Sequence, residues 1–140
     1  MLSPALLTGV AGLLALPLVA LAADQAEPNP LVIRIKSELK DPSKPFTWIV
    51  SLQAKDGVQA KLEVAFAKVA KEAHREKGCL AYDVNRDVKE PRRYLIYERW
   101  KSLADMEAHL TSPSITTLQA ELKQFLSAPP ERKLLVPVGE

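Results

Sequence analysis

The segment that decides the fold is residues 78–110, GCLAYDVNRDVKEPRRYLIYERWKSLADMEAHL. Apolar residues occupy every second position of Cys79–Arg86, which predicts a half-buried strand. The loop that follows contains a proline, and Arg93–Trp100 is rich in aromatic residues, which favours another strand. Two strands joined by a turn pair in antiparallel fashion. The segment therefore predicts a β-hairpin.

A helix follows the hairpin at once. Ser102 and Asp105 have the spacing of a capping box, in which the hydroxyl and the acidic side chain satisfy free backbone amides. Pro113 suits the first turn of a further helix, and apolar residues continue at helical spacing to Leu126. Residues 102–126 are therefore expected to be helical, with one break.

Similar patterns lie on both sides of this segment. Phe46–Ala54 is rich in aromatic and β-branched residues, which predicts a strand. After Gly57, apolar residues recur at helical spacing, and Gly78 is expected to end that helix in a left-handed conformation. Lys133–Val138 predicts a last strand, which Pro137 restricts to an edge or an end.

The order strand, helix, strand, strand, helix, strand is that of an α+β ferredoxin-like fold, a split βαβ arrangement with an antiparallel four-stranded sheet. Helices would cover one face of this sheet and leave the other bare. Tyrosine, tryptophan, isoleucine and valine on the strands make that bare face too apolar for water, so we expect a homodimer. Cys79 is the single cysteine, which excludes an internal disulfide. The net charge of +2 and the lack of a basic run argue against nucleic acid as a partner.

The N-terminal segment differs sharply from the rest. None of the 36 charged side chains (19 basic plus 17 acidic) falls in the first 23 residues. The apolar run ends in a small-x-small pattern at Ala20–Ala22, so residues 1–22 are expected to be a signal peptide that directs the protein to the periplasm or the exterior, without a membrane attachment after removal. An uncleaved N-terminal anchor is the alternative. We expect a linker over residues 23–45, in which Leu31–Leu39 alternates like an extra edge strand, and a folded domain over residues 46–138.

The run that begins GCLAY, continues through a proline-containing hairpin to YERWKS and reaches His109-Leu110 resembles the antibiotic biosynthesis monooxygenase (ABM) family. The resemblance covers about residues 46–136. It implies a dimeric α+β barrel in which two sheets face each other. It also implies a monooxygenase that oxidises quinol-like or polyphenolic substrates with molecular oxygen, without a metal or flavin cofactor.

Related members of this family include haem-degrading enzymes and an isomerase of a phosphorylated sugar signal, whose tail the stretch PPERKLL resembles. One departure concerns the residues after the tryptophan. Ser114 stands where family members frequently have a second histidine. Because a serine cannot serve as a base near neutral pH, this motif supplies one imidazole.

Two residues are candidates for catalysis. His109 lies at the margin of the apolar side of its helix, and histidine is the side chain best suited to accept a proton near neutral pH. Its alternative role is to pack and to hold the helix against a strand. Glu98 shares a strand face with Trp100, so its carboxylate needs a partner or a raised pKa. Its alternative role is structural, as a glutamate paired with an arginine, a lysine or a backbone amide at the dimer interface.

Four aromatic residues are candidates for substrate binding: Trp100, Tyr82, Trp48 and Phe66. They could stack on an aromatic substrate, and Tyr82 also offers a hydroxyl. Core packing is the alternative for each of them. His74 lies among charged residues near a helix end, which indicates a solvated histidine.

No metal site is expected, because two histidines 35 positions apart form no ligand cluster. The leading hypothesis is an exported, cofactor-independent monooxygenase of a small quinol-like or aromatic substrate. The alternative is a non-catalytic module of the same fold that binds a small apolar ligand. Isomerisation of a sugar-like signal and haem degradation are further alternatives.

Overall fold

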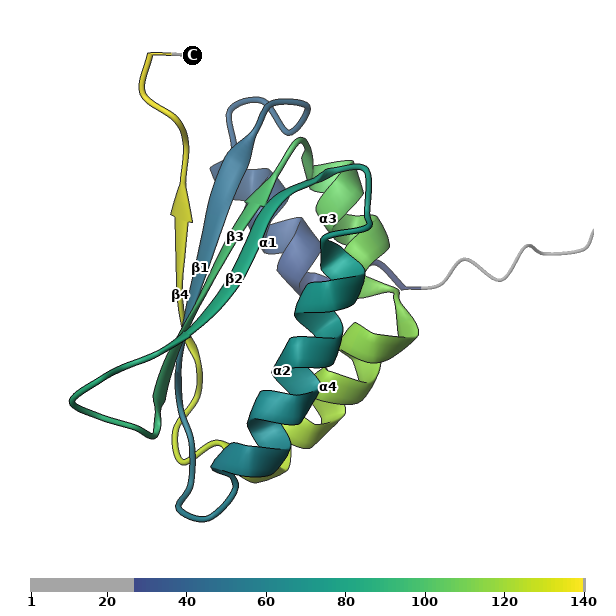
Figure 1. Ribbon diagram of the computed structural model, residues 1–140. Coiled ribbons are helices and arrows are strands. Elements are labelled where there is room, and N and C mark those ends of the chain that lie inside the picture. The colour runs from purple at the N-terminus through teal and green to yellow at the C-terminus, as the bar shows by residue number, and fades with distance from the viewer. Residues whose placement is uncertain (1–26, 140) are drawn as a thin grey trace, which may run out of the picture.

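The computed structural model describes residues 27–139 (Figure 1). The predicted signal peptide, residues 1–22, lies outside the described residues. Within the described part, no helix is long and apolar enough to cross a membrane. The elements, in chain order, are α1 (Pro30–Glu38), β1 (Phe46–Gln53), α2 (Gln59–Ala73), β2 (Cys79–Arg86), β3 (Arg93–Trp100), α3 (Leu103–Leu110), α4 (Pro113–Phe125) and β4 (Glu131–Leu135).

The strands form one antiparallel sheet in the order β2-β3-β1-β4. Figure 1 shows the helices on one side of this sheet, while its other face is open. The predicted ferredoxin-like α+β fold is thereby confirmed. The last strand begins two residues earlier than expected and ends before Pro137, because proline has no N–H to donate to the ladder. It forms the edge of the sheet, as predicted.

The strand register places one row of large side chains under the helices. Trp48 on β1 pairs with Glu98 on β3, Glu98 pairs with Tyr82 on β2, and Leu134 on β4 pairs with Trp48. Directly paired residues of an antiparallel sheet point to the same face. Glu98 therefore lies in an aromatic row on the covered face.

The open face is less aromatic than predicted. Tyr82, Trp48 and Trp100 are buried on the covered face, where they pack into the core. Apolar residues of the open face include Ile49, Leu95, Tyr97 and Leu135. Ile49 pairs with Tyr97, whereas Leu95 and Leu135 pair with polar residues of β1. The apolar surface that could drive dimerisation is therefore smaller than the sequence predicts.

The N-terminal helix α1 contradicts the prediction of an edge strand at Leu31–Leu39. The Asn29 side chain accepts a hydrogen bond from the Leu31 N–H at 2.9 Å, and Pro30 occupies the first turn. Val32, Ile35 and Leu39 are buried at helical spacing and join the core. The alternation of apolar residues was misleading because Ile33 is more than half exposed. The folded body therefore begins before residue 46, with α1.

The start of α3 has the predicted Ser102 cap, but the Asp105 carboxylate binds the Ser102 hydroxyl and not a backbone amide. The Asp105 N–H donates to Ser102 Oγ at 3.3 Å, and the Ser102 hydroxyl donates to Asp105 Oδ2. Gly78, however, is not left-handed, since the described glycines with positive φ are Gly57 and Gly139. A side chain at Gly78 would instead collide with Asp105. Glycine is needed there because α3 approaches the backbone closely.

Candidate functional site

A small chamber lies between the covered face of the sheet and the helices. Its volume is about 80 Å³. The row Trp48, Glu98 and Tyr82 contributes to its wall from the sheet, and His109 on α3 contributes from the helices. The other side chains around it come mainly from α1, α3, α4 and β4, and they are mostly apolar: Leu31, Val50, Leu52, Ile96, Met106, Leu110, Ile115, Leu118, Gln119, Leu122, Pro130 and Arg132.

His109 has one ring nitrogen bound and the other unbound. It is 1% exposed, and its Nδ1 lies 3.0 Å from both carboxylate oxygens of Glu76, in the turn between α2 and β2. Its Nε2 is buried and has no hydrogen-bond partner among residues 27–139. The carboxylate assigns the proton to Nδ1 in the neutral ring, which leaves Nε2 as a proton acceptor. The imidazole is therefore oriented as a base.

Glu98 is a carboxyl group in an apolar environment. It is 6% exposed, and its Oε2 accepts a hydrogen bond from Trp100 Nε1 at 2.9 Å. Burial raises the pKa of Glu98 to about 7, the Trp100 hydrogen bond opposes this, and the negative charge of Glu76 adds to it. Glu98 can therefore change its charge near neutral pH, as acid–base catalysts do.

Two aromatic rings hold the imidazole in place. The centroid of Trp100 lies 4.8 Å from that of His109, and the centroid of Tyr82 lies 5.4 Å from it. Burial raises the pKa of Tyr82 far above its ordinary value, so its hydroxyl stays protonated. Trp100 contacts His109 and Glu98 but is not among the residues that line the chamber. Tyr82 and Trp48 do line it.

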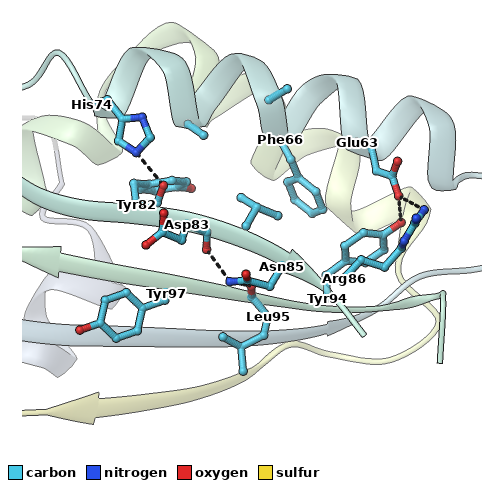
Figure 2. A pocket seen from close by; sticks show the side chains of 13 residues that line it. Glu63, Phe66, His74, Tyr82, Asp83, Asn85, Arg86, Tyr94, Leu95 and Tyr97 are labelled. Carbon is cyan, nitrogen blue, oxygen red and sulfur yellow. Dashed lines mark hydrogen bonds and ion pairs between the residues drawn. The ribbon is translucent and has the colours of Figure 1, made fainter. Parts of the chain in front are cut away.

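Phe66 lies elsewhere, in an open groove of about 770 Å³ between α2 and the strands β2 and β3 (Figure 2). Its ring meets the Tyr94 ring edge-on, with centroids 5.4 Å apart. Glu63 Oε1 accepts hydrogen bonds from the Tyr94 hydroxyl and from Arg86, both at 2.8 Å. Figure 2 shows this cluster at one end of the groove and His74 at the other.

Both the histidine and the buried Tyr94 hydroxyl of this groove already have partners. His74 Nε2 lies 2.8 Å from the Tyr82 carbonyl oxygen, which makes His74 a helix-end residue that ties α2 to β2. Burial and the Glu63 hydrogen bond raise the pKa of Tyr94 to about 12, so Tyr94 acts as a donor to Glu63. The groove is larger than the chamber, but it has no buried polar atom without a partner in the described chain. We therefore take the chamber as the candidate site.

The chamber adjoins a wider vestibule of about 590 Å³ at the surface. The vestibule lies between the start of α1, the last turns of α4, and the segment that leads into β4. The residues that line both spaces are Leu31, Gln119, Leu122, Pro130 and Arg132. A ligand in the vestibule would therefore be next to the chamber.

Sequence reasoning missed two residues of this arrangement. Glu76 was grouped with the solvated charges around His74, but it reaches His109, 33 positions away. Arg132 belongs to the PPERKLL stretch, and no local pattern connects it with α1 or α4. The sequence offered one signal for such a partner. A histidine on the apolar side of a helix is expected to be buried, and a buried histidine needs a hydrogen-bond partner.

Ser114, the departure from the family pattern, is buried and lines a depression between α2 and α4. It is not among the residues that line the chamber. Residues 27–139 contain no group of three or more histidine, cysteine, aspartate or glutamate side chains that could hold a metal ion. Because Ser114 lies outside the chamber lining, the presence of serine instead of the frequent second histidine does not change the side chains of the chamber.

Comparison with known proteins identifies the family. The family model described as antibiotic biosynthesis monooxygenase matches residues 45–121, more than half of the 140 residues. A solved structure from Chloroflexus aurantiacus, provisionally named an antibiotic biosynthesis monooxygenase, is 29% identical, with a TM-score of 0.60 and coverage of 69% of this chain and 96% of that one. No curated protein matches.

Two further structures carry the same provisional name and share the fold. The protein from Nitrosomonas europaea is 19% identical, with a TM-score of 0.65 and coverage of 72% of this chain and 97% of that one. The protein from Caulobacter crescentus is 20% identical, with a TM-score of 0.64 and coverage of 70% and 93%. Together with the family model, they confirm the resemblance seen in residues 78–110. The chain belongs to the antibiotic biosynthesis monooxygenase family.

Proposed function

We propose that this protein is a cofactor-independent monooxygenase that oxidises a small quinol-like or phenolic substrate with molecular oxygen. The observation that carries the proposal is the His109 imidazole, which lines the chamber, is buried, binds Glu76 through Nδ1 and has an Nε2 without a hydrogen-bond partner in the described chain. Burying a polar atom without a hydrogen-bond partner costs free energy. A role of Nε2 in accepting a proton from the substrate would explain why the protein tolerates this cost.

The reaction begins with transfer of the phenolic proton to His109 Nε2. The resulting phenolate is rich in electrons and reduces oxygen directly. One oxygen atom forms a new carbonyl at a ring carbon next to the one that bears the phenolic oxygen, and that carbon loses its hydrogen. The other oxygen atom leaves as water. A phenol and O₂ thus give a quinone and water, with four electrons passing from the substrate to oxygen.

Glu98 supplies the second acid–base group. Because its pKa is raised to about 7, a fraction of Glu98 is protonated at neutral pH and can donate a proton to the oxygen that leaves as water. Buried Trp48 and Tyr82 exclude water from the reacting atoms.

The sizes of the two spaces determine how a substrate is placed. A chamber of about 80 Å³ has room for oxygen and the reacting edge of a ring, whereas ligand pockets usually measure about 300–1,000 Å³. The vestibule of about 590 Å³ falls in that range. We propose that the phenolic end enters the chamber while the rest of the substrate occupies the vestibule.

Oxygen uptake with a panel of phenols and quinols tests the function. His109→Gln should lower kcat by about 10²–10⁴, the usual effect of losing a general base. The matched control is His74→Gln, because His74 is the other histidine and binds a backbone carbonyl outside the chamber. Equal turnover in the two variants, or no turnover of any substrate by the unchanged protein, would contradict the proposal.

The second candidate is a non-catalytic module that binds a small ligand. The vestibule favours it, since its volume of about 590 Å³ is by itself sufficient for a ligand and its lining includes neither His109 nor Glu98. In this case an aromatic ligand would raise the melting temperature of the unchanged protein and of His109→Gln equally, and neither would consume oxygen.

We also propose that two copies associate through the open faces of their sheets. Leu95 and Leu135 are at least 40% exposed there, and Tyr97 and Ile49 lie between them in register. Analytical ultracentrifugation should find a dimer that Leu95→Glu dissociates. Val64→Glu on α2, which is 72% exposed, is the control that should leave it intact. A monomer in the unchanged protein would exclude this assembly.

Export is proposed from the composition of the N-terminal segment. Residues 1–22 combine an uncharged apolar run with a small-x-small end at Ala20–Ala22. After expression in a bacterial host, the N-terminal sequence of the protein recovered outside the cytoplasm should begin near Ala23. Recovery of the whole chain in the membrane fraction would instead support the uncleaved anchor.

A further inference from the structure

We propose that the vestibule selects substrates with an anionic substituent, and that Arg132 binds this substituent with the help of Lys123. The inference rests on the proposed function, because it assigns the substrate class of the same site. The class is a phenol or quinol that carries a carboxylate at the end remote from the reacting carbon. The phenolic end would face His109 while the carboxylate stays at the vestibule.

The charges around the vestibule are of one sign. Arg132 on β4 and Lys123 on α4 line it, and none of its lining residues in the described chain is an aspartate or glutamate. Arg34 lies close enough to Arg132 to act on its charge, although Arg34 itself forms an ion pair with Glu38 at 2.9 Å. The vestibule therefore offers a positive local potential to a ligand.

Arg132 is available for a ligand. Among residues 27–139 it forms no ion pair, and its only hydrogen bond is a long one, from Nη1 to the Pro130 carbonyl oxygen at 3.5 Å. Arg132 is exposed at the surface. Partial desolvation, with a smaller effect of Arg34, lowers the pKa of Arg132 from its ordinary value, yet an arginine stays charged at neutral pH. A guanidinium that is partly desolvated and unpaired binds a carboxylate through two parallel hydrogen bonds.

The strand register explains why Arg132 points toward the site. It pairs with Val50 on β1, and Val50 lies on the face that the helices cover. Its neighbour Lys133 pairs with Ile49 and therefore lies on the open face. Arg132 also lines both the vestibule and the chamber, so a group bound to it is next to the chamber.

The remaining vestibule wall suits an aromatic or aliphatic body. Leu31, Leu122, Leu126 and the Ala128–Pro130 segment provide apolar surface in the same space as the cationic groups. A ligand with one charged end and one apolar end matches this combination. The PPERKLL stretch thus acquires a role, since Pro129, Pro130 and Arg132 all come from it.

Equilibrium binding measured by calorimetry without oxygen tests the inference, because it needs no turnover. The probes are 4-hydroxybenzoate and the neutral 4-hydroxybenzamide, which differ in the charge of one substituent. The unchanged protein should bind the carboxylate more tightly. Arg132→Gln should weaken its binding about tenfold, or about 1.4 kcal/mol, and leave the amide unchanged. Lys123→Gln should have a smaller effect in the same direction.

Lys133→Gln is the matched control, since it removes the same charge at the next position of β4, on the open face. It should leave both probes unchanged. Equal weakening of the two probes by Arg132→Gln, no preference in the unchanged protein, or no binding of either probe would overturn the inference. Inorganic phosphate that displaces the carboxylate at similar concentration would also overturn it, because it would show a general anion site.

Calorimetry, taken together with the oxygen-uptake assay, separates this inference from the proposed reaction. If the carboxylate preference depends on Arg132 but no phenol is oxidised, the substrate class stands for a binding module and the monooxygenase function fails. If phenols are oxidised without a preference for the anionic ones, the reaction stands and the role of Arg132 fails.

Discussion

The chamber and the groove contain similar side chains in different states. The chamber combines His109 with Glu98, and the groove combines His74 with Glu63. In the groove, Glu63 binds Tyr94 and Arg86 and is well exposed, and His74 binds a backbone carbonyl. In the chamber, Glu98 is almost fully buried and His109 has an unpartnered nitrogen.

This difference decides the chemistry. An ion pair at a solvated surface contributes little to stability and keeps its groups occupied. A carboxyl group and an imidazole in a water-excluded chamber are costly to bury, which shifts the Glu98 pKa into the range useful for proton transfer. The presence of histidine, glutamate and tyrosine in a hollow is therefore a weaker indicator of function than their burial and the partners they lack.

The largest expected difference between the two regions concerns stability against pH. Burial raises the Glu98 pKa from 4.5 to about 7, so between these values the folded chain keeps a proton that the unfolded chain releases. The contribution of Glu98 is thus present in full below pH 4.5 and is lost as the pH rises through 7. The loss is on the order of 3 kcal/mol.

Chemical denaturation from pH 4.5 to pH 8 measures this loss. Glu98→Gln should abolish it, so that the variant gains stability relative to the unchanged protein as the pH rises. Tyr94→Phe in the groove is the control, because the Tyr94 hydroxyl titrates only near pH 12. Parallel pH curves for Glu98→Gln and the unchanged protein would mean that Glu98 titrates normally.

The next largest effect concerns the orientation of His109. Glu76→Ala should lower kcat by up to about 10²-fold, because misplacing a catalytic group by about 1 Å has that effect. Glu76→Gln, whose side-chain oxygen can still accept a hydrogen bond from the Nδ1–H group of His109, should recover part of the loss. A purely structural role would change the free energy of unfolding in both variants without this recovery of kcat.

The nitrogen that carries the proton can be observed directly. ¹⁵N NMR of the neutral His109 ring should show the proton on Nδ1 in the unchanged protein and a shift of population toward Nε2 in Glu76→Ala. A proton on Nε2 in the unchanged protein would remove the base from the chamber and contradict the orientation by Glu76.

The smallest effect is expected in the groove. Glu63→Gln weakens the interactions with Arg86 and Tyr94, and because Glu63 is well exposed, the free energy of unfolding should fall by about 1 kcal/mol or less. Oxygen uptake should stay within about twofold of that of the unchanged protein. A loss of turnover comparable to that of His109→Gln would move the functional site to the groove.

The fold could be predicted from the sequence because its elements have local signals. Alternation, helical spacing and the Ser102 capping box located each strand of the sheet and the helices α2, α3 and α4. The α1 helix was missed because Leu31, Ile33 and Ile35 imitate a strand pattern. The Asn29-Pro30 pair was the better indicator, since asparagine caps a helix and proline begins one.

The candidate site could be predicted only in part. The spacing around Glu98 and His109 marked both residues, since a strand end and a capped helix are local features. The contact between His109 and Glu76 depends on how α3 packs against a distant turn, which no local pattern encodes. Phe66 shows the opposite case, since its position on the apolar side of α2 does not reveal which space its ring lines.

The central claim is that the chamber, rather than the groove, receives the substrate. The chain has two histidines, and each belongs to one region. Titration of the full protein with 4-hydroxybenzoate in the absence of oxygen, followed by ¹⁵N NMR of both imidazoles, compares the regions in one spectrum. The account predicts that the His109 signals move and broaden while those of His74 stay in place. Movement of the His74 signals alone would contradict it.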